Sequence, residues 1–197
     1  MKNTFDLRGR KTSSIDSDMG TWIYATDAFG ELYQQTSAVE AANHTTTALA
    51  YDALGRLVSR VEPDMSATWT YGASAANHNI DALVSTNCTG ATCGPGYSRS
   101  YTFDSIGRPL QTTLSTGGIN FHNITTYDVT TGKIVSVRNY SGFTQDFVYS
   151  AHGYLSSIHD DATPTLVYWA ATARNASLQL TKSVAAMAPS PRTATTP

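Results

Sequence analysis

The sequence has few charged residues and no cluster of basic ones. Asp, Glu, Lys and Arg make up 14% of the 197 residues, and the formal net charge is −2. The 13 basic side chains are spread along the chain. Nucleic-acid binding depends on clustered Lys and Arg that neutralise phosphates. The composition therefore argues against a nucleic-acid partner.

Long hydrophobic runs are also missing. No segment approaches the roughly 18 apolar residues that a membrane helix requires. The N-terminus, MKNTFDLRGRKTSS, lacks the apolar stretch of a secretory signal peptide. We therefore expect neither a membrane span nor a signal peptide in this chain.

Cysteine is scarce, with only Cys88 and Cys93 in the segment TNCTGATCGPG. Two thiols make a poor structural zinc site, which usually needs four ligands. Two readings stay open, a pair of free thiols in an exposed loop or a local disulfide. A disulfide would indicate an oxidising compartment.

Catalytic and cofactor motifs are absent as well. The sequence contains no GxSxG, P-loop, GxGxxG or HExxH pattern. The histidines show no spacing typical of metal ligands and are expected in solvated turns and loops. They are His44, His78, His122, His152 and His159. We expect no cofactor, no metal site and no enzymatic activity.

One short phrase recurs along the chain: an aromatic residue, Asp, two or three residues, Gly, and then a basic or polar residue. It appears as FDLRGRK (5–11), YDALGRL (51–57), FDSIGRP (103–109) and YDVTTGKI (127–134), with weaker copies TDAFGEL (26–32) and YSAHGYL (149–155). Degenerate copies place Asp81 and Leu178 at the glycine position. The eight repeats are then spaced by 21, 25, 26, 26, 25, 21 and 25 residues. Such regularity predicts a repeat architecture.

Turn chemistry explains the phrase. In Asp-x-x-Gly, the Asp side chain accepts backbone N–H bonds at the start of a type I turn, and Gly adopts the positive φ of a G1 bulge. These residues are predicted to be structural rather than catalytic. The predicted turn residues are Asp6, Gly9, Asp27, Gly30, Asp52, Gly55, Asp104, Gly107, Asp128, Gly132 and Gly153.

Between the turns, polar and apolar residues alternate with the period of a half-buried strand. Leu57, Ser59 and Val61 share one face, and Trp69 and Tyr71 share another. Each repeat is predicted to be a hairpin of two strands. The expected fold is all-β, a curved open sheet of antiparallel hairpins over residues 1–182. The Ala/Pro/Thr-rich segment 183–197 is expected to be a disordered tail.

The phrases YDALGRL, FDSIGRP and YDVTTGKI, with VYWAATARNASLQLTK (167–182), resemble Rhs/YD-repeat proteins. This family includes bacterial Rhs polymorphic toxins, the C component of Tc toxins, wall-associated repeat proteins and teneurins. The resemblance implies a segment of a hollow, secreted or cell-surface β-shell that encloses a C-terminal toxin or effector. The expected partners are the remaining repeats, the enclosed domain and further copies of the chain.

The sequence departs from the family in lacking any Asp-Pro pair, so self-cleavage is not carried over. The tail composition suggests a truncated remnant of a longer gene.

The aromatic residues support a different class of function. Rows such as Trp22 with Tyr24, or Trp69 with Tyr71, are expected to fill the sheet face and to pair across strands. Exposed aromatic rings also stack on sugars. The alternative function is therefore an extracellular carbohydrate- or cell-surface-binding module.

Overall fold

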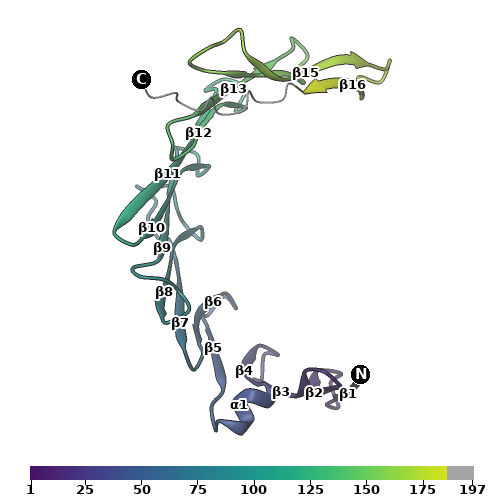
Figure 1. Cartoon of the computed structure of the whole chain (residues 1–197), viewed down its shortest axis with the longest axis vertical. Coiled ribbons are helices and arrows are strands. Elements are labelled where there is room, and N and C mark those ends of the chain that lie inside the picture. The colour runs from purple at the N-terminus through teal and green to yellow at the C-terminus, as the bar shows by residue number, and fades with distance from the viewer. Residues whose placement is uncertain (186–197) are drawn as a thin grey trace, which may run out of the picture. The chain divides into compact units, whose positions relative to one another are not determined.

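The structure is a computed structural model, and it describes residues 1–185. Sixteen strands form one open antiparallel sheet, in which each strand lies next to the strand that follows it in the chain (Figure 1). The strands are β1 (Lys2–Phe5), β2 (Lys11–Asp16), β3 (Gly20–Thr26), β4 (Leu32–Thr36), β5 (Thr47–Tyr51), β6 (Leu57–Val61), β7 (Met65–Tyr71), β8 (Leu83–Gly90), β9 (Ser98–Phe103), β10 (Pro109–Thr116), β11 (Ile119–Tyr127), β12 (Ile134–Arg138), β13 (Thr144–Tyr149), β14 (Leu155–Asp160), β15 (Val167–Arg174) and β16 (Leu180–Ala185). The predicted all-β fold of antiparallel hairpins in an open sheet is confirmed.

The chain divides into two compact units. The first comprises Met1–Arg108 with Thr113–Asn120, and the second comprises Pro109–Thr112 with the residues from Phe121 onward. Both are built from the same hairpin. In the first unit, β5 and β6 pair with a bulge between Ala50 and Tyr51. In the second unit, β13 and β14 pair with a bulge at the equivalent place, between Val148 and Tyr149.

Side-chain burial alternates along some strands, such as β5, β7 and β9, and is uniform in others, such as β14 and β16. In β7, Ala67 is buried, Trp69 and Tyr71 are half-buried, and the threonines between them are exposed. Among the described residues only Ala67, Ser14 and Thr47 are classed as buried. The strand period predicted from the sequence is thus present, but it separates half-buried from exposed residues.

One short helix, α1 (Ala38–Ala42), interrupts the hairpins between β4 and β5. Ser37 caps it by accepting from the Glu40 backbone N–H, and the Glu40 side chain accepts from the Ser37 backbone N–H. This reciprocal pair is a capping box. No helix was predicted here, although Ser37-x-x-Glu40 is the usual sequence signature of a helix start.

The C-terminal boundary differs slightly from the expected one. Strand β16 continues through residues 183–185, which the sequence had assigned to the tail. The rest of that predicted tail, 186–197, lies outside the described residues. The helix α1 is too short to cross a membrane, and no other described segment is a helix that could.

Candidate functional site: the repeated turn and a groove beside it

The turn at Asp52 illustrates how the phrase folds. One carboxylate oxygen, Oδ1, accepts the backbone N–H of Leu54 at 2.9 Å and of Arg56 at 3.0 Å. The Gly55 N–H donates to the Asp52 carbonyl at 3.0 Å, and the Asp52 N–H donates to the Arg56 carbonyl at 2.9 Å. Gly55 has φ +75°, which closes the hairpin through a bulge. These four bonds close the turn on itself.

The second carboxylate oxygen binds the cation that follows the glycine. The Arg Nε lies 2.7 Å from Oδ2 in the pairs Arg10–Asp6 and Arg56–Asp52, and 2.6 Å away in Arg108–Asp104. The Arg56 backbone N–H, followed by the Arg56 side chain, lowers the pKa of Asp52. The pKa values of Asp6 and Asp104 are lowered as well. These carboxylates remain ionised and fully bonded.

The predicted turn glycines all have positive φ. The values are Gly9 +77°, Gly30 +97°, Gly55 +75°, Gly107 +82°, Gly132 +71° and Gly153 +80°. The two residues that take the glycine place in degenerate repeats behave alike, with φ +60° at Asp81 and +61° at Leu178. The carboxylates of Asp27 and Asp128 accept backbone N–H bonds as Asp52 does. At the last two turns Ser150 and Asn175 stand in the aspartate position, and their side-chain oxygens accept the corresponding N–H.

Cations also link several turns to the next one, and these links were not predicted from the sequence. Arg10 Nη1 donates to the Asp27 carbonyl at 2.7 Å, and Lys133 Nζ donates to the Gly153 carbonyl at 2.6 Å. Arg56 reaches the Asp81 carboxylate at 3.1 Å. The basic residue after the glycine was visible as part of the phrase. Its acceptor was not, because a carbonyl about 20 residues away leaves no mark in the sequence.

Tyrosines link the turns in the opposite direction. Tyr51 Oη donates to the Leu32 carbonyl at 3.0 Å, and Tyr127 Oη donates to the Pro109 carbonyl at 2.8 Å. In both cases the acceptor lies two residues after the glycine of the preceding repeat. Arg174 acts similarly and donates to the Leu155 carbonyl at 2.7 Å. The first residue of the phrase therefore donates a hydrogen bond at Tyr51 and Tyr127, whereas the ring of Tyr149 lies 5.0 Å from Lys133 Nζ.

Glu31 breaks the pattern, because an acid stands where most strong copies have a cation. Burial is the first cause that raises the pKa of Glu31, and the neighbouring carboxylates of Asp27 and Asp52 raise it further. Among the six quoted copies of the phrase, TDAFGEL (26–32) is the only one with an acidic residue directly after the glycine. The local charge arrangement disfavours the ionised acid.

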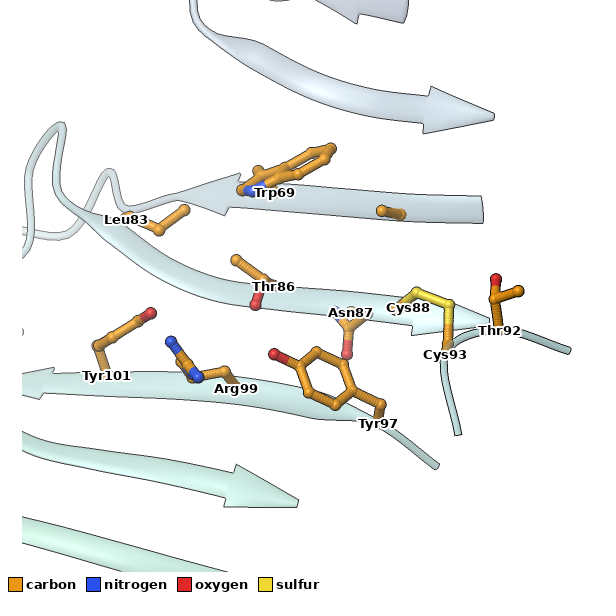
Figure 2. Close-up of a pocket in the computed structure, with 11 residues that line it drawn as sticks. Trp69, Leu83, Thr86, Asn87, Cys88, Thr92, Cys93, Tyr97, Arg99 and Tyr101 are labelled. Atoms are coloured by element: carbon orange, nitrogen blue, oxygen red, sulfur yellow. A yellow bond between two sulfur atoms is a disulfide. The ribbon is translucent and has the colours of Figure 1, made fainter. Parts of the chain in front are cut away.

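A groove lies on the face of β7, β8 and β9, inside the first compact unit (Figure 2). Its volume is about 540 Å³. Cys88 and Cys93 form a disulfide at one end of the groove. Of the two possibilities left open by the sequence, free thiols or a local disulfide, the structure has the disulfide. Arg99 lies between Tyr97 and Tyr101 on one side, with Trp69 across β8 from it.

Comparison with known proteins places the fold. No family model and no curated protein matches the sequence. Among solved structures, a Tc holotoxin pore from Photorhabdus luminescens aligns over 91% of this chain and 11% of its own, with a TM-score of 0.51 and 14% identity. The complex TcdB2–TccC3–Cdc42 aligns over 78% of this chain and 8% of its own, with a TM-score of 0.53 and 14% identity. TcdB2–TccC3 without its hypervariable C-terminal region gives a TM-score of 0.50 at 14% identity. The chain has the fold of an Rhs/YD-repeat segment.

At this level of identity the likeness concerns the fold, and this chain spans only 8–11% of the length of those solved chains. The hairpins described above share their fold with segments of those chains. The linked turns give that fold a physical basis, because they join several hairpins to their neighbours.

Other candidate chemistry in the YD repeats is dispersed. In residues 1–185 no group of three or more His, Cys, Asp or Glu side chains is arranged to hold a metal ion. His44 and His78 lie in loops with positive φ. His159 is engaged by Ser157 and by the Pro164 carbonyl. The structure does not bring the histidines together.

Proposed function

We propose that this chain is a structural segment of a longer YD-repeat protein whose repeats form a hollow shell around a C-terminal toxin or effector. The chain itself performs no catalysis. The observation that carries the proposal is the set of hydrogen bonds between successive turns, exemplified by Arg10 to Asp27 and Tyr51 to Leu32. Such bonds extend a scaffold by one hairpin at a time.

The exposure of apolar side chains also favours a larger assembly. Five turn tips carry large apolar residues that are mostly exposed: Leu7, Phe29, Leu54, Ile106 and Val129 are 108%, 92%, 68%, 72% and 98% exposed. Turn tips are normally polar, so apolar tips that recur from repeat to repeat favour a partner surface. In a complete shell these residues would meet other parts of the protein.

The ionisable groups support a non-catalytic role. A general acid or base needs a free proton site with a pKa near the working pH. Asp6, Asp52 and Asp104 instead have lowered pKa values and spend both oxygens on turn bonds. These aspartates recur along the chain because each of these turns uses one.

The disulfide supports a location outside the reducing cytosol, because such bonds persist in oxidising compartments. The similar structures are components of Tc toxins. A secreted or cell-surface location for the parent protein accords with both points.

The scaffold role is tested by adding repeats in phase. A second copy of residues 52–103, inserted after Phe103, restores the order of turn, strand, turn and strand. The urea midpoint should rise, because each new hairpin contributes an interface with its neighbour. The matched control inserts residues 53–103, which shifts the register by one residue and reverses the strand faces. Equal midpoints for the two insertions would contradict the proposal.

The enclosing role is tested by the DNA around the coding sequence. We expect further in-frame YD repeats, followed by a domain of different composition. Flanking DNA with no trace of such repeats would refute this part of the proposal and leave the scaffold role to be judged by the insertions.

A further inference from the structure

The groove on β7, β8 and β9 is lined by aromatic rings around one cation. Trp69 pairs in register with Thr86, and Thr86 pairs with Arg99, so the three side chains form one row across the sheet. Tyr97 and Tyr101 lie two residues before and after Arg99 and therefore share its face. The groove is therefore lined by one guanidinium, with Tyr97 and Tyr101 on the same strand segment and Trp69 across β8 (Figure 2).

Arg99 differs from the turn arginines in having no acidic partner. The ion pairs of the described residues involve Arg10, Arg56, Arg60 and Arg108, each with a carboxylate, and none involves Arg99. Its Nε is buried without a hydrogen-bond partner in residues 1–185. The Tyr101 side chain, followed by Tyr97, raises the pKa of Arg99. A permanent positive charge thus lies in the groove without a countercharge.

The rim of the groove is polar and fixed. The disulfide between Cys88 and Cys93 closes one end, and the Cys88 N–H donates to the Tyr97 carbonyl at 3.2 Å. Thr86 adds a hydroxyl group beside the rings. The volume of about 540 Å³ is in the range of small-ligand sites, about 300–1,000 Å³.

We propose that this groove binds an acidic sugar residue of a glycan, such as a sialic or uronic acid. The carboxylate pairs with the Arg99 guanidinium, whose planar fork matches a carboxylate in two hydrogen bonds. The apolar face of the sugar ring stacks on Trp69 or Tyr97, and a sugar hydroxyl meets the Thr86 hydroxyl. Charge complementarity selects the acidic sugar over a neutral one.

This activity is independent of the scaffold role, because it uses one sheet face and not the turns. A failure to bind sugar would leave the linked hairpins as they are. Failure of the repeat-insertion experiment would likewise leave the groove untouched.

The probes are 3′-sialyllactose and a hyaluronan tetrasaccharide, titrated into the full chain while Trp fluorescence and heat are recorded. The ligand controls are lactose and the methyl ester of 3′-sialyllactose, which keeps the sugar but removes the charge. We expect saturable binding of at least one acidic probe, and at least tenfold weaker binding of its uncharged counterpart. Equal binding of charged and uncharged forms, or no saturable binding, would overturn the proposal.

The protein controls are Arg99→Met and Arg99→Lys, with Arg8→Met as a matched removal of an exposed arginine elsewhere. Arg99→Met should weaken binding at least tenfold, Arg99→Lys should weaken it less, and Arg8→Met should leave it unchanged. Circular dichroism checks that each variant folds. If Arg99→Met does not fold, the comparison of 3′-sialyllactose with its methyl ester on the parent protein still tests whether binding needs the carboxylate charge. Tighter binding of phenylacetate than of either acidic sugar would show that the groove selects aromatic acids and refute the sugar assignment.

Discussion

Two glycines with positive φ should respond very differently to the same substitution, alanine. Gly9 has φ +77°, and a Cβ built there has no other atom within 4 Å. Gly90 has φ +123°, and its Cβ would overlap the Asp64 carbonyl oxygen and lie 2.7 Å from Met65 Cα. Both atoms belong to the backbone of the turn at residues 62–65, which joins β6 to β7, so no side-chain rotation can relieve the overlap. Gly90 is also the last residue of β8, the strand that contains Cys88.

The expected costs follow from these surroundings. At Gly9 a left-handed backbone costs a non-glycine residue about 1–2 kcal/mol, and alanine recovers about 0.4–1 kcal/mol by restricting the unfolded chain. The net loss at Gly9 is then at most about 1.6 kcal/mol and centres on about 0.8 kcal/mol. At Gly90 the strain is up to about 3 kcal/mol, because this φ region is used almost only by glycine. Displacing the turn also weakens the bond from the Ala91 N–H to the Asp64 carbonyl, 3.0 Å long. We expect a total of about 3 kcal/mol for Gly90→Ala.

Urea unfolding of the two variants and the parent, followed by Trp fluorescence, measures the difference. Trp69 lies on β7, which pairs directly with β8, so it reports on the affected hairpin. Circular dichroism provides a second probe of the whole sheet. Equal losses at Gly9 and Gly90 would refute the close approach of the 62–65 turn to the end of β8.

Four further outcomes follow from the geometry. Tyr51→Phe removes the bond to the Leu32 carbonyl and should cost about 0.5–1.5 kcal/mol in urea unfolding; an unchanged midpoint would show that this link contributes nothing. Glu31 has a raised pKa, so its penalty is absent below the ordinary Glu pKa and complete above the raised one. Glu31→Gln should therefore raise the urea midpoint at pH 7 but not at pH 3, and a gain of equal size at both would contradict the charge argument. Reducing the bond between Cys88 and Cys93 should cost about 2 kcal/mol by the loop-entropy relation, with the double alanine variant, insensitive to reductant, as control. Because β1 and β16 each pair with one strand in the described part of the chain, light scattering should show association that grows over micromolar concentrations; a constant monomer mass would argue otherwise.

The parts of the fold that the sequence predicted are those with a short-range cause. Asp52 and Gly55 are three residues apart, and their turn closes through bonds within five residues. The alternation of Trp69 and Tyr71 with threonine follows from the pleat of one strand. Repetition then multiplied each local signal, so that even Asp81 and Leu178 could be placed at the glycine position.

The parts that were missed depend on longer distances or on an interruption of the repeat. The partner of Arg10 is a backbone carbonyl 17 residues away, which any residue could supply. The groove draws on three strands, and the meeting of Trp69 with Arg99 depends on two registers. Helix α1 departs from the repeat altogether, and only its capping box marks it.

The bonds between turns have an asymmetry with an evolutionary consequence. The donor is a particular side chain, such as Arg10, Tyr51 or Lys133, whereas the acceptor is a main-chain carbonyl. Mutation can therefore replace the residue on the accepting side without changing the bond. Selection needs to preserve only one residue for each such contact, and the strands between turns are free to vary as long as they alternate. Sequences that keep these donors can therefore differ widely and still adopt one fold, and this chain shares its fold with Tc toxin structures at 14% identity.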